Sequence, residues 1–217
     1  MIPTLYDCFK HWAKSGSVYI ISDTHFEDAD CKLMDKDWIL PQEHVKAIKE
    51  KVHKTDTLIH LGDVGNIEYF SQIPGYKVLI MGNHDQGVKK YKEVFAEVYQ
   101  GPLFISDKLL LSHEPVLSEY WFNIHGHDHS NESKEENNHI NLASNVYGYK
   151  VFNLGKEIEK GLLKDVENIH RHTIDKATER KQKREKDFFD SFLEKWLWIT
   201  LPLKECGFSA TYFYNIK

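Results

Sequence analysis

The chain has 217 residues, and its 41% apolar and 13% aromatic side chains are enough to bury a sizeable core, which excludes a disordered protein. Its 28 basic and 33 acidic residues give a net charge of −5, which argues against a protein that holds nucleic acid by bulk charge but allows an anionic substrate beside bound metal ions. Three scattered cysteines indicate a reducing compartment, so we expect a cytoplasmic protein. No apolar run approaches the ~20 residues of a membrane span, so we expect no membrane partner.

The first half of the chain alternates between strand and helix patterns. Residues 1–16 place Leu5, Phe9 and Trp12 at helical spacing and predict a short N-terminal helical extension. Strands are expected over 18–22, 57–62 and 77–82, and helices over 41–54, 67–73 and 88–98. This order is typical of a parallel sheet that is covered by helices.

The second half changes character, because its strand patterns follow one another without long helical crossovers. Strands are expected over 103–106, 109–112, 121–125, 139–147 and 150–154. They predict a second sheet, mixed or antiparallel. A helix is expected to begin near Lys156, so that residues 17–155 form the core and residues 156–217 form C-terminal helices and a tail that pack on the core or on a second subunit.

Two features stand out in the C-terminal part. Arg171 to Lys186 holds seven Lys/Arg against three Asp/Glu and predicts a solvated helix, with a phosphate-contacting arm as the alternative. An apolar stripe at helical spacing follows, made of Phe189, Phe192, Leu193, Trp196 and Leu197. The stripe predicts packing against the core or the formation of a homo-oligomer.

A side chain that can bind metal follows each of five apolar runs. The carboxyl ends of parallel strands meet at one edge of a sheet, where ligands bind in open α/β folds. The spacings Asp-x-His and His-x-His also put the first and third residues on one side of an extended chain. One site is therefore expected from side chains far apart in the sequence: Asp23, His25, Asp63, Asn83, His84, His113, His127 and His129.

These donors are oxygen and imidazole nitrogen, with no thiolate. Such a set suits Mn²⁺ first, with Fe, Zn²⁺, Co²⁺ or Ni²⁺ as alternatives. Even seven of these eight side chains are too many ligands for one catalytic ion that keeps an open position. They fit two divalent ions that share one carboxylate, an arrangement that clamps the attacking and leaving oxygens of a displacement at phosphorus.

The blocks in which these residues stand resemble the five signature motifs of the calcineurin-like metallophosphoesterases. They read Asp23-Thr24-His25, Gly62-Asp63-Val64-Gly65, Gly82-Asn83-His84-Asp85, Ser112-His113-Glu114-Pro115 and Gly126-His127-Asp128-His129. The resemblance covers about residues 17–155. It implies an α/β fold, a four-layer α/β/β/α sandwich with two central mixed sheets, followed here by the C-terminal helical extension.

The resemblance also implies a role for each residue. Three side chains would hold the first ion: Asp23, His25 and His129. Three would hold the second: Asn83, His113 and His127. Asp63 would bridge both ions, and His84 would be the catalytic histidine, which does not bind metal.

The implied activity is hydrolysis of a phosphodiester or a small phosphomonoester by a hydroxide that bridges the two ions. Protein phosphatase activity is not expected, because Ile67 and Met81 stand where protein phosphatases of this superfamily have phosphate-binding arginines. A catalytically idle metal-binding scaffold for protein interaction is one alternative. A nuclease is another, although the net charge does not favour nucleic acid as a partner.

Several further polar residues have open roles. The carboxylate that orients the catalytic histidine in the related phosphatases is missing, and Asp85, Asn66 or a backbone carbonyl are the alternatives that could replace it. His125 precedes Gly126 and is a candidate to support a ligand through a hydrogen bond. Asp28 is interpreted as a loop or capping residue. Trp38 is expected either to line the pocket or to pack under its loop.

Overall fold

The computed structural model describes residue 12 and residues 16–130, 138–167 and 169–205. The predicted N-terminal helix over 1–16 therefore lies outside the described residues, except for Trp12 and Gly16. The chain divides into two compact units, residues 1–169 and residues 170–217, and each is described by itself.

The first sheet has five strands in the order β4-β3-β2-β1-β9. Three neighbouring strands are parallel and rich in buried Val, Ile and Leu: β1 (Val18–Ile21), β2 (Thr57–His60) and β3 (Tyr76–Ile80). Ile20 pairs with Ile59 in this register, and both side chains are fully buried. Burial of one such side chain contributes about 1.5–3 kcal/mol. The predicted parallel arrangement of these strands is confirmed.

The second sheet has four strands in the order β5-β6-β7-β8. Its members are β5 (Leu103–Ser106), β6 (Leu109–Leu111), β7 (Phe122–His125) and β8 (His139–Asn141). β5 and β6 are antiparallel, while β6, β7 and β8 are parallel to one another. The expected α/β fold with two mixed sheets and a C-terminal helix is confirmed.

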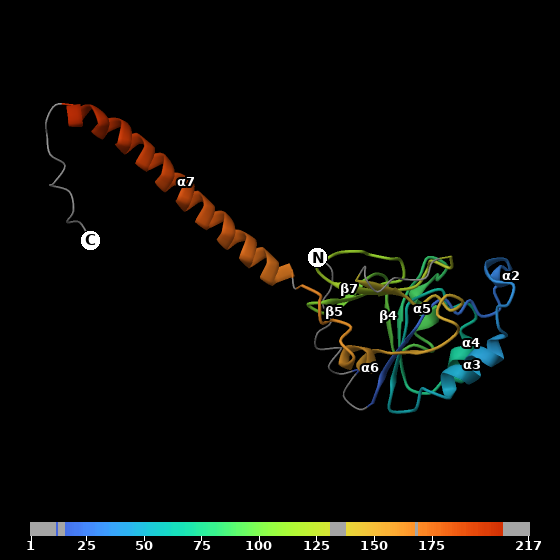
Figure 1. Ribbon diagram of the computed structural model, residues 1–217. Coiled ribbons are helices and arrows are strands. Elements are labelled where there is room, and N and C mark those ends of the chain that lie inside the picture. The colour runs from blue at the N-terminus through green and yellow to red at the C-terminus, as the bar shows by residue number, and fades with distance from the viewer. Residues whose placement is uncertain (1–11, 13–15, 131–137, 168, 206–217) are drawn as a thin grey trace. The chain divides into compact units, whose positions relative to one another are not determined.

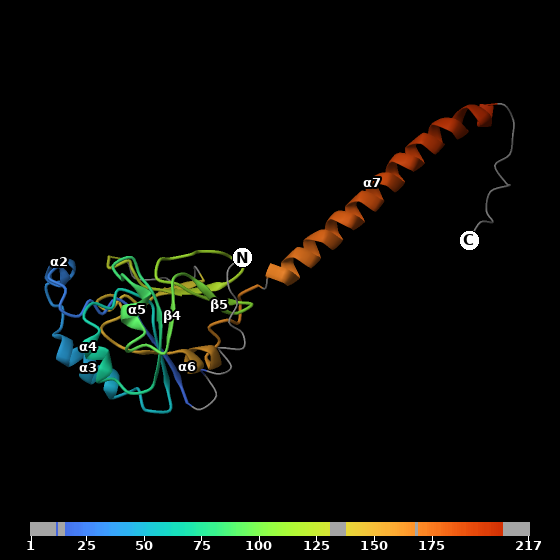
Figure 2. The same ribbon diagram turned by 180° about the vertical axis from the view of Figure 1, so that it is seen from behind.

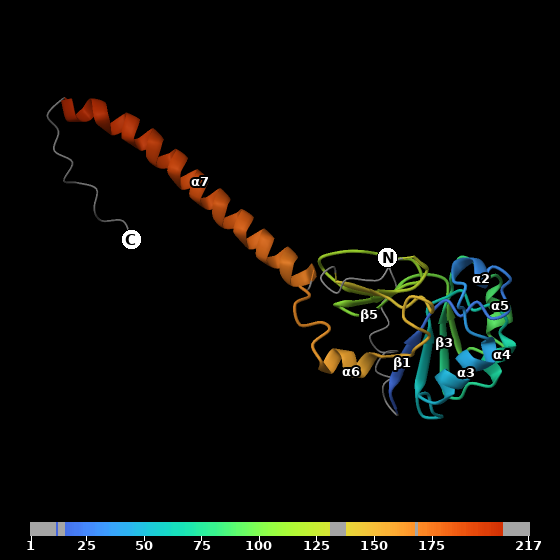
Figure 3. The ribbon, with the colours of Figure 1, turned by 45° about the vertical axis from the view of Figure 1, so that its right-hand side comes forward.

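Helices cover the outer face of the five-stranded sheet. Figures 1, 2 and 3 show α3 (Pro41–Lys49), α4 (Glu68–Ser71) and α5 (Val88–Tyr91) grouped on the side away from β5. Their core cluster includes Ile48 and Phe70, which have no exposed surface. A second cluster fills the space between the sheets, where Ile59 meets side chains such as Leu111. The remaining short helices are α2 (Cys31–Met34) and α6 (Leu154–Glu159).

Three predicted elements differ from the structure. The helix expected over 88–98 ends at Tyr91, and β4 (Glu97–Tyr99) follows because β3 offers it an edge to pair with. The strand expected over 139–147 ends at Asn141. The last strand, β9 (Phe152–Asn153), joins the first sheet antiparallel to β1 instead of extending the second sheet. Each difference depends on a partner strand that local sequence does not reveal.

The described part of the second unit is helical: it belongs to the long helix α7 (Ile169–Glu205), drawn as one continuous helix in Figure 1. The charged stretch is helical, as predicted, and the side chains of residues 173–192 are exposed. The exposed residues include Phe188, Phe189 and Phe192. Within the described part of the chain, no helix combines the length and the apolar character needed to cross a membrane.

Candidate metal centre

The first group of ligand atoms stands at the carboxyl ends of β1 and β7. Asp23 and His25 follow β1, and His129 follows β7. Nε2 of His129 lies 3.6 Å from Oδ1 of Asp23, and Nε2 of His25 lies 4.0 Å from the same oxygen. Asp23 and His25 are buried. Because one atom from each residue lies within 4.8 Å of the others, the group could hold a metal ion.

The second group combines Asp63, His113 and His127, which follow β2, β6 and β7. Nε2 of His113 lies 3.3 Å from Oδ2 of Asp63 and 3.1 Å from Nδ1 of His127. The amide oxygen of Asn83, after β3, lies 2.9 Å from His113 Nε2 and 3.1 Å from His127 Nδ1. Four side chains from four strand ends therefore converge on one point.

Asp63 faces both groups. Its Oδ2 lies 3.3 Å from His113 of the second group and 3.6 Å from His25 of the first. Its other oxygen, Oδ1, accepts a 2.9 Å hydrogen bond from the backbone N–H of His84. That bond fixes the carboxylate so that Oδ2 points between the two groups.

Outer partners set the tautomers of three histidines. The Nδ1–H of His25 donates to Asp28 (3.0 Å). That of His113 donates to the Leu61 carbonyl (2.8 Å), and that of His129 donates to the side-chain oxygen of Asn145 (2.8 Å). Each Nε2 is thereby directed at the carboxylates: it donates to them when the ring is protonated and would present its lone pair to a metal ion when the ring is neutral, as expected of metal-binding histidines. Nε2 of His25 is buried and has no hydrogen-bond partner among the described residues.

The donor geometry fits small divalent cations. Nitrogen and oxygen ligands about 2.1 Å from one ion at tetrahedral or octahedral angles lie about 3.0–3.4 Å apart. The separations among Asn83, His113 and His127 run from 2.9 to 3.1 Å. Lone pairs packed this closely repel one another unless a cation or a proton lies between them.

The backbone is strained where it presents the ligands. Positive φ angles, which L-residues rarely adopt, occur at Asp23 (52°), His25 (40°), Asp63 (57°) and His127 (69°). Hydrogen bonds between the loops hold these turns, for example from the Asp23 N–H to the Gly62 carbonyl (2.9 Å). Such strain is common at functional sites.

Glycine allows the ligand loops to approach one another. A Cβ on Gly82 would lie 2.3 Å from Oδ1 of Asp63 and 2.8 Å from Cε1 of His113. A Cβ on Gly126 would lie 2.0 Å from Oδ2 of Asp23. Neither position can hold a larger residue without displacing a candidate ligand.

Burial and charge act against each other on the ligand carboxylates. Burial raises the pKa of Asp23, and the neighbouring His113 charge offsets only part of this rise. Burial also acts to raise the pKa of Asp63, but its hydrogen bond with His113 and the charge of that residue outweigh burial and lower the pKa to about 2. Asp63 is therefore ionised at neutral pH.

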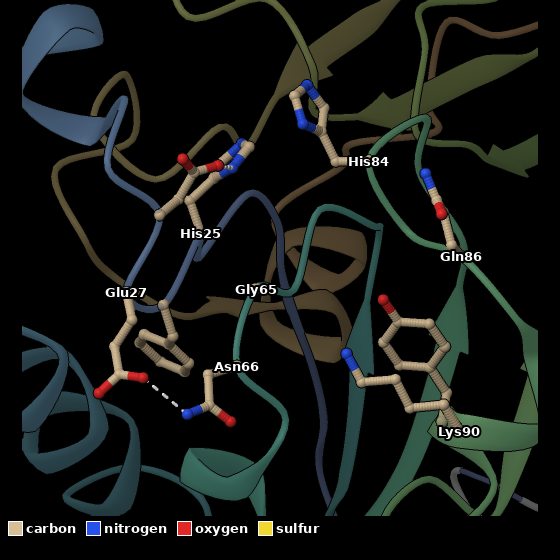
Figure 4. A pocket seen from close by; sticks show the side chains of 10 residues that line it. His25, Glu27, Gly65, Asn66, His84, Gln86 and Lys90 are labelled. Atoms are coloured by element: carbon tan, nitrogen blue, oxygen red, sulfur yellow. Dashed lines mark hydrogen bonds and ion pairs between the residues drawn. The ribbon is translucent and has the colours of Figure 1, made fainter.

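A pocket of about 520 Å³ opens beside the first ligand group (Figure 4). His25 and His84 form its wall toward the ligands, and the two rings are 5.3 Å apart, edge to face. The imidazole of His84 is exposed. Glu27, Asn66, Gln86 and Lys90 line the remainder. A small molecule in this pocket would reach both His84 and the first ligand group.

The residues that we considered as supports for His84 have other partners. The Asp85 carboxylate accepts hydrogen bonds from the backbone N–H groups of Asp63 (2.8 Å), Val64 (3.1 Å) and Gly82 (2.9 Å), and from the Tyr91 hydroxyl. Asp85 therefore joins two ligand loops and does not bond to His84.

Asn66 and His125 also bond elsewhere. Asn66 donates a 2.7 Å hydrogen bond to Glu27, across one wall of the pocket. Together with Tyr69, Asn66 lowers the pKa of Glu27. His125 is buried and bonds to the Gly126 carbonyl (2.8 Å) and to His139 (3.0 Å).

Sequence reasoning missed two residues that position candidate ligands. Asp28, interpreted as a loop residue, accepts the hydrogen bond from His25, and its place three residues after that histidine in a turn was an available signal. Asn145 bonds to His129 through both its side-chain oxygen and its amide nitrogen, and nothing in the sequence linked the two. Trp38 is buried and packs against the rings of His25 and His129.

Comparison with known proteins supports the fold. No protein-family model matches the sequence, and no curated protein matches it. Among solved structures, AQ665 from Aquifex aeolicus, a protein of unknown function, is similar with 26% identity and a TM-score of 0.54, over 66% of this chain and 98% of that one. Nuclease MPE from Pseudomonas putida gives 20% identity and a TM-score of 0.39, over 51% of this chain and 60% of that one. Fold and ligand groups together define an α/β protein with a candidate centre for two metal ions.

Proposed function

We propose that this protein is a metal-dependent phosphoesterase that hydrolyses phosphodiesters or small phosphomonoesters. The observation that carries the proposal is the position of Asp63. One carboxylate oxygen lies 3.3 Å from a histidine of one ligand group and 3.6 Å from a histidine of the other, as a ligand shared by two adjacent ions requires. The five sequence motifs that resemble the metallophosphoesterases support the same activity.

Two divalent cations are the proposed cofactors, with Mn²⁺ first and Fe, Zn²⁺, Co²⁺ or Ni²⁺ as alternatives. The carboxylate, amide and imidazole donors suit these ions, and the described ligand groups contain no thiolate. When bound, such ions would supply Lewis acidity toward the phosphate and an activated water. We assign Asp23, His25 and His129 to one ion, the set Asn83, His113 and His127 to the other, and Asp63 to both.

His84 is the proposed catalytic residue. Its ring is exposed at the pocket, and its backbone N–H bonds to Asp63, so its position is linked to that of the shared carboxylate. An imidazole exchanges protons near neutral pH and can donate one to the oxygen of a leaving group. Among the described residues no hydrogen bond to the His84 ring is formed. The ring is thus available to a substrate.

The proposal is tested by metal removal and restoration. Chelator-treated protein should not hydrolyse bis(p-nitrophenyl) phosphate or p-nitrophenyl phosphate, and Mn²⁺ should restore activity together with two bound ions per chain by elemental analysis. Asp63→Ala should bind neither ion firmly and should stay inactive after Mn²⁺ is added. Two bound ions without hydrolysis of any phosphate ester would favour the idle scaffold instead.

Compartment and assembly remain part of the proposal. A reducing compartment, the cytoplasm, is consistent with Cys31, which is a buried free thiol. A homo-oligomer through α7 is consistent with its exposed Phe188, Phe189 and Phe192. Sedimentation of the full chain and of a Phe189→Ser/Phe192→Ser variant would test the homo-oligomer, since the variant should sediment with the smaller mass of a dissociated chain.

A further inference from the structure

The pocket beside the first ligand group carries charges of opposite sign on its two sides. Glu27 and Asp28 lie on the loop after β1, and Lys90 lies on α5. Among the residues that line the pocket, Lys90 is the one lysine or arginine. Figure 4 shows its amine directed toward the space between α5 and the loop that carries Asn66. The amine is a strong, mobile hydrogen-bond donor within the pocket.

The Lys90 amine is free to bind a ligand. No ion pair to it is formed by the described residues, and its contact is with the face of the Tyr91 ring, 5.6 Å from the ring centre. Tyr91 in turn donates a 2.9 Å hydrogen bond to Asp85, the residue that joins the two ligand loops. The helix that presents Lys90 is therefore tied to the candidate metal centre.

The opposite wall carries two acidic side chains, Glu27 and Asp28, whose charges disfavour an anion. The Glu27 carboxylate accepts hydrogen bonds from Asn66 (2.7 Å) and from the Tyr69 hydroxyl (2.8 Å). The Asp28 carboxylate is held by His25. An anionic group that enters the pocket is repelled by these acids and attracted to Lys90, so the charges also determine how a substrate is oriented.

We propose that Lys90 binds a second anionic group of the substrate, carried by the part of the ester that leaves from the reacting phosphate. This inference rests on the proposed function, since His84, which also lines the pocket, is assigned to the leaving oxygen. The substrate class is thus a phosphate ester whose alcohol carries a carboxylate or a further phosphate. Lys90 determines specificity and takes no part in the chemical step.

The test compares two esters of the same shape, 3-carboxyphenyl phosphate and 3-carbamoylphenyl phosphate, which differ in one negative charge. With Mn²⁺-loaded protein, Lys90→Gln should lower kcat/KM for the carboxylate about ten-fold, the size of one charge-assisted hydrogen bond, and leave the carbamoyl ester within about two-fold. Lys89→Gln is the matched control, because Lys89 is adjacent on α5, is exposed and does not line the pocket. It should change neither ester.

A loss on both esters alike, no loss on either, or an equal effect of Lys89→Gln would overturn the inference. Binding of 3-hydroxybenzoate to chelator-treated protein, followed by NMR titration, gives a readout that does not need turnover. Lys90→Gln should weaken this binding about ten-fold relative to wild type and Lys89→Gln. If wild type hydrolyses neither ester, the proposed function fails, and this titration alone decides whether Lys90 binds anions in the pocket. Binding unchanged by Lys90→Gln would refute it.

Discussion

Oδ2 of Asp85 accepts a 2.8 Å hydrogen bond from the backbone N–H of Asp63, although the two residues belong to different ligand loops. The same oxygen accepts a bond from the Gly82 N–H. Asp85 therefore sets the position of the carboxylate that faces both ligand groups, although it is not among the candidate ligands itself. Residues that shape a metal centre often act through the backbone of the ligands in this way.

Asp85→Ala should destabilise the protein and loosen the metal centre. It leaves three backbone N–H groups and the Tyr91 hydroxyl without their acceptor in a buried site, which predicts a loss of about 3 kcal/mol in the free energy of unfolding. Urea unfolding measures this loss, and Mn²⁺ affinity should fall with it. Asp30→Ala, an exposed carboxylate without a side-chain capping bond, should stay within about 0.5 kcal/mol of wild type.

Gly82→Ala should displace Asp63. The added Cβ would lie 2.3 Å from the Asp63 carboxylate, so this carboxylate must move. We expect Mn²⁺ affinity to fall at least ten-fold by calorimetric titration, as when a ligand loses its supports. Gly101→Ala is the control, because nothing lies within 4 Å of its Cβ position. Equal affinities in the two variants would contradict the assigned role of Asp63.

His84→Ala should separate metal binding from turnover. The His84 ring is exposed and is not among the converging ligand atoms, so both ions should stay bound in elemental analysis. The rate on an aryl phosphodiester should fall about 10²-fold or more, the usual effect of removing a general acid. Loss of the ions along with the rate would show that His84 is a ligand.

Asp28→Ala should weaken the first ion alone. It removes the acceptor that directs Nε2 of His25 toward Asp23 and Asp63. Loss of such a support costs about 10–100-fold in metal affinity. Competition with a metal-binding dye should then show one weakened and one unchanged ion. Asp28→Asn keeps an acceptor for His25 and should recover most of the affinity.

His44 should make stability depend on pH. Burial lowers the pKa of His44 to about 4, while an unfolded histidine has a pKa of about 6.5. Between these values the unfolded state binds a proton that the folded state does not, so stability falls as the pH drops from 6.5 to 4. The full effect is about 3 kcal/mol. Urea unfolding at pH 7 and pH 4.5 should show a smaller drop for His44→Phe than for wild type.

The sequence predicted the α/β fold, and it also predicted that the side chains of the candidate metal centre come together at one edge of the sheets. Asp23, Asp63, Asn83 and His113 lie two or three residues beyond the ends of their strands, and the carboxyl ends of parallel strands meet whatever the connecting segments do. The break between α5 and β4 could not be predicted, because helical spacing of Tyr91 and Phe95 also suits a turn that buries both rings. Asn145 could not be assigned either, since its bond to His129 depends on loops that only the folded chain brings together.

Each ligand group draws on both sheets. Asp23, His25 and Asp63 extend from strands of the first sheet, and His113, His127 and His129 from strands of the second. A cation held by either group would cross-link the two sheets, and its release would let them separate at that edge. Backbone amides of β1 and β7 would then exchange hydrogen with solvent faster in the metal-free protein than in the metal-bound protein. Their exchange rates would therefore report metal occupancy directly in a cell extract.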